Sequence, residues 1–366
     1  MAFAARACPL ASPGGHNVFT NMISHLGPRR LSSPAKPNGL SHQPSTRCAA
    51  FPDFIPADQA QEIQEPAAVQ MLEKMQRADL NVPGLGRVQT SFVSHPATTE
   101  FSSNNDLPAF VLLHGFDSSL LEFRRFAPVL SQVGDVFAVD LAGWGFSDCG
   151  FSERSDIELG PTQKRAHLRA FCEQVIGRPV VLLGTSLGGT VAIDFTLNNP
   201  ELVQNLILVD AQGFIDGIGP LASMPRFLSV LGVQLLRSVP LRQMANQMAY
   251  CDKKKYATDD AMRIGRLHTH LPGWTDANVA FMRSGGYSVS TRLNEVKVPT
   301  LIVWGRQDEI LSPDYAQQFI DALPDARLVW VDQCGHVPAL EQPQELLKAV
   351  QEFVGAEKEK KMAVLN

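Results

Sequence analysis

From residue 88 onward, short continuous apolar runs alternate along the chain with longer segments in which apolar residues recur at helical spacing. A run of four to eight apolar residues between turn residues is typical of a strand buried on both faces, and a spacing of three or four residues is typical of an amphipathic helix. The pattern predicts strands at residues 88–93, 110–113, 136–141, 179–183, 206–209, 301–304 and 328–331, and helices at 121–130, 161–175, 188–197, 313–323 and from residue 343. Strands separated by helices imply an α/β fold, in which a mostly parallel sheet has helices on both faces.

The alternation of strands and helices stops in the long segment 213–296, where the pattern is mostly helical. An insertion of this size between two strands of a sheet predicts a helical lid. The predicted organisation is an N-terminal extension at 51–83, a core at 84–212 and 297–356, a lid at 213–296 and a charged C-terminal tail at 357–366, which begins as the solvated, fraying end of the last helix.

The first 50 residues differ in composition from the rest of the chain. Asp53 is the first acidic residue, and it is preceded by the basic residues Arg6, Arg29, Arg30, Lys36 and Arg47. An acid-poor segment that contains Arg and is rich in Ser is typical of an organelle transit peptide, and this one lacks the apolar stretch of a secretory signal. Scattered Ser and Pro favour the chloroplast over the mitochondrion. Residues 1–50 are therefore predicted to be a disordered chloroplast transit peptide, with an untargeted tail as the alternative.

Composition and charge exclude several classes of function. The chain of 366 residues is 45% hydrophobic and 19% charged, as expected for a protein that buries a full core. Its net charge of -5 offers no basic surface for nucleic acid, and no apolar run approaches the roughly 18 residues of a membrane-spanning helix. The six cysteines include no CxxC pair and no zinc-ligand spacing, so free thiols in a reducing compartment are expected.

Motifs for cofactors and metals are absent from the sequence. It contains neither the GxGxxG pattern of dinucleotide-binding proteins nor the GxxxxGK[ST] pattern of phosphate-binding loops. His268 and His270 could suggest a metal site, but two histidines without nearby carboxylates or thiols are a weak signal, and both are interpreted as lid residues. We therefore expect no cofactor, no metal and no nucleic-acid partner.

The strongest chemical signal is Gly184-Thr185-Ser186-Leu187-Gly188, which matches the pattern G-x-S-x-G. This segment follows a predicted buried strand and opens a predicted helix, which is the context of a nucleophile elbow. A serine in so tight a turn needs small neighbours, and Gly184, Gly188 and Gly189 provide them. Ser186 is therefore the predicted nucleophile. The alternative is a glycine-rich turn that only packs a helix against a strand.

A nucleophilic serine needs a base, and the base needs an acid that orients it. Asp308 follows the predicted strand at 301–304 and His336 follows the one at 328–331, so the chain order is Ser, Asp, His. The carboxyl ends of parallel strands meet at one edge of a sheet, which would bring these residues together. Asp308 is the predicted acid, Glu309 is its lower-ranked competitor, and His336 is the predicted base.

An oxyanion hole is predicted from two backbone N–H groups. His114-Gly115-Phe116 follows an upstream strand, so the N–H of Phe116 can join the N–H of Leu187, the residue after the nucleophile. The ring of His114 itself is interpreted as structural.

The predicted lid has a distinctive composition between residues 217 and 251. This stretch is rich in Leu and Met and contains no acidic residue, whereas Arg226, Arg237 and Arg242 are present. Most of its apolar side chains are expected to cover the sheet. Apolar and positively charged residues in combination also suit a lid that accepts a lipidic substrate or contacts an anionic membrane surface.

Four further segments give the chain a resemblance to a known family. They are LHGFDSS at 113–119 followed by Leu121-Glu122, GWGFSD at 143–148, IGRLH at 264–268 and FMRSGGY at 281–287. Between about residues 111 and 354 the sequence resembles the α/β-hydrolases of plant and algal plastids, and among them the chlorophyll dephytylases. The two lid segments are the more specific part of this resemblance. Thr185 departs from it, because Pro is expected before the nucleophile in the close relatives.

The resemblance implies an α/β-hydrolase fold in which Ser186, Asp308 and His336 form a catalytic triad. It also implies hydrolysis of the phytyl ester of chlorophyll to chlorophyllide and phytol in the chloroplast, at the thylakoid or in the stroma. The expected partners are a hydrophobic ester, namely chlorophyll, and the thylakoid surface, which the lid would contact peripherally.

Three other functions could use the same residues. The first is a carboxylesterase or lipid acyl hydrolase with a different plastid substrate, and the second is a cofactor-free C–C bond hydrolase. The third is a small-molecule receptor that keeps the triad but turns over too slowly to be an enzyme. A serine nucleophile argues against haloalkane dehalogenases and epoxide hydrolases, which need a carboxylate at this position.

Overall fold

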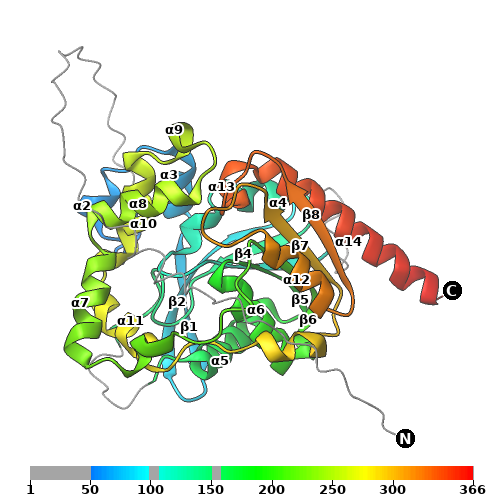
Figure 1. Cartoon of the computed structure of the whole chain (residues 1–366), viewed down its shortest axis with the longest axis horizontal. Helices are drawn as coiled ribbons and strands as arrows, with labels where there is room; N and C mark the ends of the chain where they lie inside the picture. Colours follow the sequence, from blue (N-terminus) through cyan, green and yellow to red (C-terminus); the bar gives the residue numbers. More distant parts are fainter. Residues whose placement is uncertain (1–50, 99–106, 151–157, 366) are drawn as a thin grey trace, which may run out of the picture. The chain divides into compact units, whose positions relative to one another are not determined.

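The computed structural model describes residues 51–98, 107–150 and 158–365, and within them eight strands form one sheet (Figure 1). The strands are β1 Gln76–Val82, β2 Gly86–His95, β3 Ala109–Leu113, β4 Asp135–Val139, β5 Val180–Thr185, β6 Val203–Val209, β7 Thr300–Gly305 and β8 Ala326–Val331. Their order in the sheet is β1-β2-β4-β3-β5-β6-β7-β8, in which β2 is antiparallel to both neighbours and all other pairs are parallel. The predicted α/β fold with a mostly parallel sheet is confirmed. The predicted transit peptide at 1–50 lies outside the described residues.

Burial explains which strands the sequence pattern predicts and which one it misses. The central strands β3, β5 and β7 are buried along their whole length, so they are continuous apolar runs. The edge strand β1 has the sequence QRADLNV, in which only Leu80 and Val82 are buried. The sequence pattern therefore assigns it to the N-terminal extension. The core begins earlier than residue 84, because β1 pairs with β2 along its full length.

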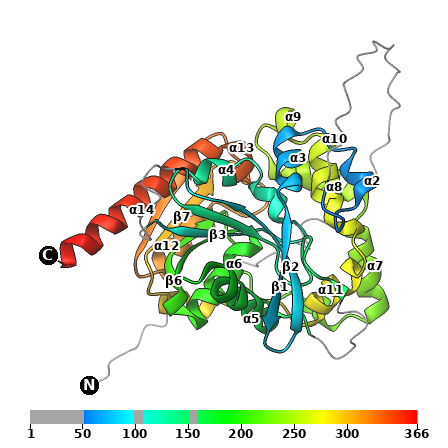
Figure 2. The ribbon, with the colours of Figure 1, turned by 180° about the vertical axis from the view of Figure 1, so that it is seen from behind.

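Helices cover both faces of the sheet (Figures 1 and 2). Helices α4 Ala127–Leu130 and α14 Pro343–Leu365 lie on one face, and α5 Pro161–Phe171, α6 Leu187–Asn198 and α12 Asp314–Ala322 lie on the other. The helix predicted at 121–130 is instead a 3-10 turn, Leu120–Phe123, followed by the short helix α4. Pro128 lies in the first turn of α4, where its missing N–H is tolerated, and it cannot continue a helix that starts earlier.

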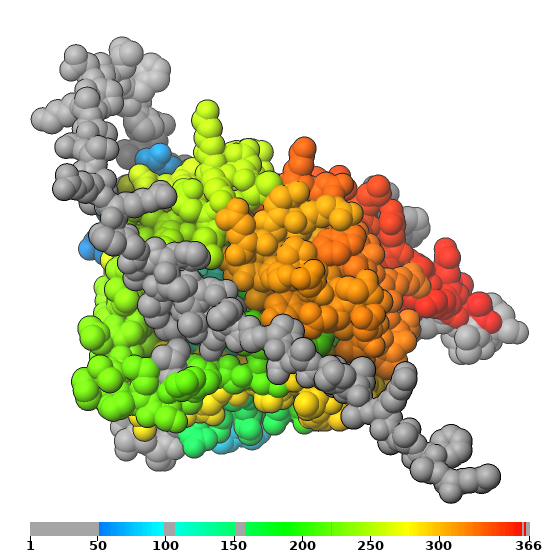
Figure 3. All heavy atoms as spheres, viewed as in Figure 1, coloured from blue at the N-terminus to red at the C-terminus, as the bar shows by residue number. Residues whose placement is uncertain are grey.

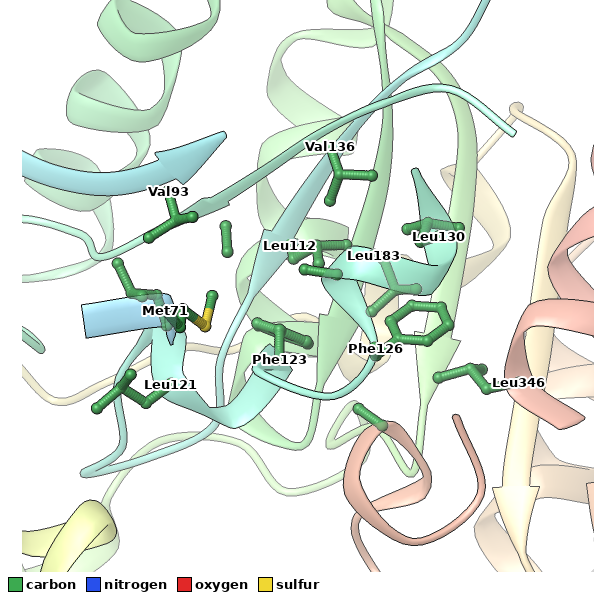
Figure 4. Close-up of a cluster of buried hydrophobic side chains, with 14 of the residues drawn as sticks. Met71, Val93, Leu112, Leu121, Phe123, Phe126, Leu130, Val136, Leu183 and Leu346 are labelled. Carbon is green, nitrogen blue, oxygen red and sulfur yellow. The ribbon is translucent and has the colours of Figure 1, made fainter. Parts of the chain in front are cut away.

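A continuous buried cluster fills the space between the sheet and helices α4 and α14 (Figure 4). Alternate residues of the central strands enter it, and the opposite set faces the helices on the other side. Its labelled members include Leu112, Val136 and Leu183 from the strands, Phe126 and Leu130 at α4, Leu346 from α14, and Met71 from helix α3 Pro66–Glu73. Because α3 contributes to this cluster, the segment before β1 is part of the core.

The predicted lid segment contains five helices between β6 and β7 among the described residues. They are α7 Arg226–Leu236, α8 Val239–Ala249, α9 Lys253–Tyr256, α10 Asp259–Arg266 and α11 Trp274–Arg283. Helix α10 lies beside α2 Ala57–Ala60 and α3 (Figures 1 and 2). Asp260 accepts hydrogen bonds from the backbone N–H groups of Gln64 and Glu65 at 3.0 and 2.7 Å. The segment before β1 therefore contacts both the core and the lid.

The C-terminal segment is the end of a helix, as expected, and Glu357 is the residue that departs from the predicted solvated environment. Helix α14 continues to Leu365, and Glu357 is buried within it. The Glu357 carboxylate pairs with Arg327 of β8 at 2.9 Å and with Lys360 at 2.8 Å. The charged run therefore begins in contact with the sheet edge. None of the helices described in the chain has the length and apolar character that a membrane span requires.

Candidate active site

Ser186 occupies a strained turn between β5 and α6. Its backbone angles are φ 49° and ψ −122°, a region that residues with a Cβ seldom adopt. The strain is supported by hydrogen bonds, because Ser186 N donates to Val209 O at 3.1 Å and Ser186 O accepts from Gly189 N and Gln212 N at 3.0 and 2.9 Å. The Ser186 side chain is half-buried. This is the geometry expected for the predicted elbow.

Two glycines around Ser186 are required by close backbone approach. A Cβ on Gly184 would lie 2.2 Å from the carbonyl oxygen of Gly188, and a Cβ on Gly188 would lie 2.1 Å from the carbonyl oxygen of Leu113. Both distances are far below van der Waals contact, so the turn and its packing against β3 tolerate only glycine at these positions.

Asp308 and His336 are in direct contact at the carboxyl ends of β7 and β8. His336 Nδ1 lies 2.7 Å from Asp308 Oδ2, and both side chains are buried. The other oxygen of Asp308 accepts the backbone N–H groups of Ile310 and Leu311 at 2.7 and 3.0 Å. Burial alone lowers the pKa of His336, but the Asp308 carboxylate outweighs it, so the pKa is raised above its ordinary value. Asp308 therefore orients the imidazole of His336 and stabilises its protonated form.

Glu309, the competing acid, lies in a different environment. Its side chain is exposed, and both carboxylate oxygens lie 2.8 Å from Lys253 Nζ. Since Glu309 points to solvent and is already paired, the contact with His336 belongs to Asp308.

The loop after β3 passes directly against Ser186. A Cβ on Gly115 would lie 3.1 Å from Ser186 Cβ and 3.7 Å from Ser186 Oγ. Phe116 follows in this loop, and Leu187 is the first residue of α6. The N–H groups in the first turn of a helix have no partner within the helix, so the Leu187 N–H is suited to receive an anion. The two residues predicted for the oxyanion hole thus flank the nucleophile from two chain segments.

Glu122 brings a carboxylate to the same place. One of its oxygens accepts the hydroxyl of Thr185, the residue before the nucleophile, and the other accepts the N–H of Gly115 at 3.2 Å. In the sequence, Glu122 stands out only as part of a family motif and Thr185 only as a departure from it. No local pattern signals this pair, because the two residues come from different elements.

Asp210 is a second carboxyl group next to Asp308. It follows β6 with a φ of 42°, is completely buried, and accepts the N–H of Gly305 at 2.8 Å. One atom each of Asp210, Asp308 and His336 lie within 4.8 Å of one another. Burial and then the Asp308 charge raise the pKa of Asp210 well above its ordinary value. The carboxyl end of the predicted strand at 206–209 was a signal that could have identified it.

The hydrogen bonds of the Asp210–Asp308–His336 cluster are those of an oriented acid–base pair. Both oxygens of Asp308 and one oxygen of Asp210 already accept hydrogen bonds from the protein. Few lone pairs remain free to point at a metal ion, so the arrangement does not suit a metal ligand set.

Three histidines without an assigned catalytic role have other polar partners. His114 is buried, with Nδ1 2.8 Å from Gly115 O and Nε2 3.3 Å from Asp140 Oδ1, which is a structural environment. In the lid, His268 Nε2 lies 3.2 Å from Asp117 Oδ1, whereas His270 Nδ1 lies 3.2 Å from an Arg237 nitrogen. His268 and His270 have different partners and do not converge on one point, consistent with their interpretation as lid residues.

Polar contacts connect the lid to the loops of the candidate site on two sides. Arg242 of α8 pairs with Asp117, next to Phe116, at 2.5 Å and also donates to the Asp117 carbonyl at 2.9 Å. On the other side, Glu341 accepts the N–H groups of Gly335 and Cys251 at 2.6 and 3.1 Å. The lid is therefore bound both to the loop that carries Phe116 and to the loop that carries His336.

Comparisons with known proteins agree with the fold. A model described as the alpha/beta hydrolase family matches residues 110–349. The alpha/beta hydrolase domain-containing protein VTE7 of Arabidopsis thaliana is 36% identical over 330 residues, which cover 90% of this chain and 98% of that protein. A 2-hydroxy-6-oxononadienedioate/2-hydroxy-6-oxononatrienedioate hydrolase of Cupriavidus pinatubonensis is 28% identical over 261 residues, covering 67% of this chain and 86% of that protein.

Among solved structures, a thermophilic esterase from Thermogutta terrifontis is similar with a TM-score of 0.63. The sequence identity is 20%, and the match covers 77% of this chain and 99% of the esterase chain. At this identity the likeness shows a shared fold.

Proposed function

The chain belongs to the alpha/beta hydrolase family, and from this premise we propose that it is a serine carboxylic-ester hydrolase of the chloroplast that removes phytol from chlorophyll. The observation that carries the esterase part is the 2.7 Å contact between His336 Nδ1 and Asp308 Oδ2, at the sheet edge where Ser186 has a strained backbone. An oriented histidine and an elbow serine are the groups that acyl transfer requires.

In the proposed reaction, Ser186 Oγ attacks the ester carbonyl while His336 Nε2 takes the hydroxyl proton. His336 then passes this proton to the leaving alcohol, and phytol departs. A water molecule, deprotonated by His336, attacks the acyl-enzyme, and His336 returns the proton to Ser186 Oγ as the pigment acid is released. Asp308 stays ionised throughout and stabilises the imidazolium.

The negative charge that develops on the carbonyl oxygen needs hydrogen-bond donors. We assign this role to the N–H groups of Phe116 and Leu187. Each such donor is worth about 3 kcal/mol of transition-state stabilisation. The N-terminus of α6 adds its dipole at the same position.

The substrate assignment is supported by the composition of the lid, by the transit-peptide-like composition of residues 1–50 and by the resemblance to chlorophyll dephytylases. A phytyl ester presents a long apolar chain, and the lid supplies many apolar side chains. The magnesium ion belongs to the pigment and is part of the substrate. The enzyme itself then needs no cofactor and no metal for ester hydrolysis.

Peripheral contact with the thylakoid is part of the same proposal, and helix α7 supports it. Phe227, Leu231 and Leu235 are 70%, 67% and 46% exposed, and they recur every four residues on one helical face. They are three of the four exposed large hydrophobic residues in the described parts of the chain. Exposed apolar residues gathered on one helix, with Arg226 and Arg237 at its ends, suit an anionic lipid surface.

A C–C bond hydrolase is the second candidate, and the similarity to the 2-hydroxy-6-oxononadienedioate hydrolase favours it. Such an enzyme would use the same serine, histidine and aspartate. An esterase or lipid acyl hydrolase with another plastid substrate also fits these residues, and a slow-turnover receptor is the remaining alternative.

The test is a chromatographic product assay. The full chain is incubated with chlorophyll a in mild detergent, beside its Ser186→Ala variant. The proposal expects chlorophyllide and phytol from the parent and at least about a thousandfold less from the variant.

The outcomes separate the alternatives. Hydrolysis of p-nitrophenyl esters that depends on Ser186, without chlorophyllide, would keep the esterase and reject the pigment substrate. Cleavage of a 2-hydroxy-6-oxo acid in place of both esters would establish the second candidate. Tight saturable binding of chlorophyll with negligible turnover would establish a receptor.

A further inference from the structure

The Glu122 carboxylate lies beside the nucleophile. The point at which a Cβ on Gly115 would stand is 3.7 Å from Glu122 Oε2 and 3.7 Å from Ser186 Oγ. Its two oxygens accept the Gly115 N–H and the Thr185 hydroxyl, so the charge is held between the loop after β3 and the residue before Ser186. The side chain is half-buried, so water screens it only in part.

The negative charge of Glu122 is not neutralised by an ion pair in the described parts of the chain. Both of its hydrogen-bond donors are uncharged groups. The arginines that follow it in sequence, Arg124 and Arg125, pair with Glu65 at 2.9 and 2.7 Å. Arg242 of the lid pairs with Asp117. The space in front of Ser186 therefore faces a carboxylate without an arginine or lysine partner in the described residues, and His336 and His114 are the titratable groups that interact with it.

A fixed negative charge at this distance acts unequally on different acyl groups. It leaves the binding of a neutral ester unaffected, but it repels a substrate that carries a free carboxylate near the scissile carbonyl. It also repels the carboxylate product that the hydrolysis of any ester creates at Ser186. At a separation of several ångströms and an effective dielectric constant of about 20, such repulsion changes binding by about tenfold to a hundredfold.

We propose that Glu122 is a specificity-determining residue that restricts the site to acyl groups without a negative charge and promotes release of the carboxylate product. Thr185 is the residue that holds Glu122 in place. This inference rests on the proposed function, because it takes Ser186 as the nucleophile. It also predicts that the dioate-type substrates named for the bacterial C–C hydrolase relative are poor substrates here.

The experiment compares two p-nitrophenyl esters of similar acyl length, the neutral butyrate and the anionic hemiglutarate, with the parent and with Glu122→Gln. Glutamine preserves the size of the side chain and an oxygen for the Gly115 N–H, but removes the charge. The parent is expected to favour the butyrate by at least tenfold in kcat/KM. In Glu122→Gln this ratio falls to within about threefold of unity, mainly through a lower KM for the hemiglutarate.

Two further readouts depend on the same charge. The inhibition constant of free butyrate is expected to fall by about tenfold in Glu122→Gln, because the product anion is no longer repelled. Glu122 also helps to raise the pKa of His336, after Asp308, so the acid limb of the pH–rate profile shifts to lower pH in the variant. A side chain that acts only on folding would change neither the inhibition constant nor the acid limb of the pH–rate profile.

The matched control is Glu309→Gln, which removes the same charge at an exposed site paired with Lys253. It is expected to leave the butyrate to hemiglutarate ratio within twofold of the parent value. The proposal is wrong if Glu122→Gln keeps the parent ratio, or if it lowers both rates equally, since the carboxylate would then only support the loop.

The failure of the proposed function has a different signature. If chlorophyll is not cleaved, the two model esters still measure the role of Glu122. If neither ester turns over, labelling of Ser186 by a neutral and a carboxylate-bearing fluorophosphonate supplies the same comparison. Equal labelling by the two probes in the parent would contradict the proposal.

Discussion

Asp210 and Asp308 present their carboxyl groups to each other at the ends of the neighbouring strands β6 and β7, behind the histidine that Asp308 orients. Asp210 is fully buried and its Oδ1 is bound to the N–H of Gly305, while its Oδ2 has no donor. Two ionised carboxylates in such contact would repel strongly. A proton on Asp210 turns the contact into a hydrogen bond to Asp308 and leaves the negative charge on the residue that faces His336.

Asp210→Asn and Asp210→Ala are expected to behave differently. Asparagine can accept from Gly305 and donate to Asp308, as the protonated acid does, so kcat/KM near neutral pH should stay within a few-fold of the parent. Alanine removes a hydrogen bond to a charged group, worth about 1.5–3 kcal/mol, and should cost about tenfold or more. Ester hydrolysis by both variants across the pH range provides the measurement. Equal losses would mean that Asp210 has no proton-donating role.

The same residue predicts a pH dependence of stability. The pKa of Asp210 in the folded protein is raised above its unfolded value, so the folded state keeps a proton that the unfolded chain releases. The free energy of unfolding therefore falls as the pH rises from about 4 toward the folded pKa. In Asp210→Asn this decline should be absent, as urea unfolding at a series of pH values would reveal. A parallel decline in parent and variant would assign it to other groups.

His336 predicts the acid limb of the reaction. Catalysis as a base requires neutral imidazole, and the pKa of His336 is raised above 6.5 because the Asp308 carboxylate outweighs burial. The ratio kcat/KM should therefore increase with pH through an apparent pKa above 6.5. Asp308→Asn is expected to move this limb to lower pH and to reduce kcat by about ten-thousandfold. An unchanged limb in this variant would exclude Asp308 as the partner of the titrating group.

The ion pair between Arg242 and Asp117 predicts a link between the lid and the loop that carries Phe116. Both side chains are largely buried, and removing one partner leaves the other charge buried, which costs about 3–5 kcal/mol. Arg242→Met should lower the free energy of unfolding by about that amount and raise KM. The control is Arg226→Met, which breaks the exposed pair with Asp276 and should cost less than about 1 kcal/mol. Similar losses in the two variants would contradict the link.

The exposed face of α7 predicts lipid binding. Flotation with vesicles that contain an anionic lipid should recover the parent protein, and the double variant Phe227→Ser, Leu231→Ser should remain unbound. Met362→Ser changes another exposed apolar residue, on α14, and should float like the parent. Flotation of the double variant equal to the parent would remove α7 as the contact surface.

The pattern of residues determined the framework of this protein. Central parallel strands such as β3, β5 and β7 are buried on both faces, so their sequences are continuous apolar runs that can be recognised without a structure. The elbow at Ser186 was predictable because it depends on local chemistry, namely glycines at fixed offsets from a serine between a strand and a helix. The predicted order of Ser186, Asp308 and His336 followed from strand ends, and the structure brings Asp308 and His336 into contact.

The edge of the sheet was less predictable, for a physical reason. Strand β1 buries only Leu80 and Val82, so its polar sequence carries no run that distinguishes it from an extension. Pairing with β2 determines the position of β1 in the sheet. In the same way, the burial of Glu357 depends on Arg327 of β8, which is distant in sequence.

Only the tertiary structure decided which polar groups lie close together at the candidate site. Glu122 accepts a hydrogen bond from Thr185, Asp210 lies beside Asp308, and Arg242 pairs with Asp117, although the partners are so far apart in sequence that no local pattern indicates the contact. Electrostatic interactions depend on distance and on burial, and both quantities exist only after the strands and the lid have packed. The sequence therefore determined which groups could react, and the packing determined the electrostatic environment of these groups.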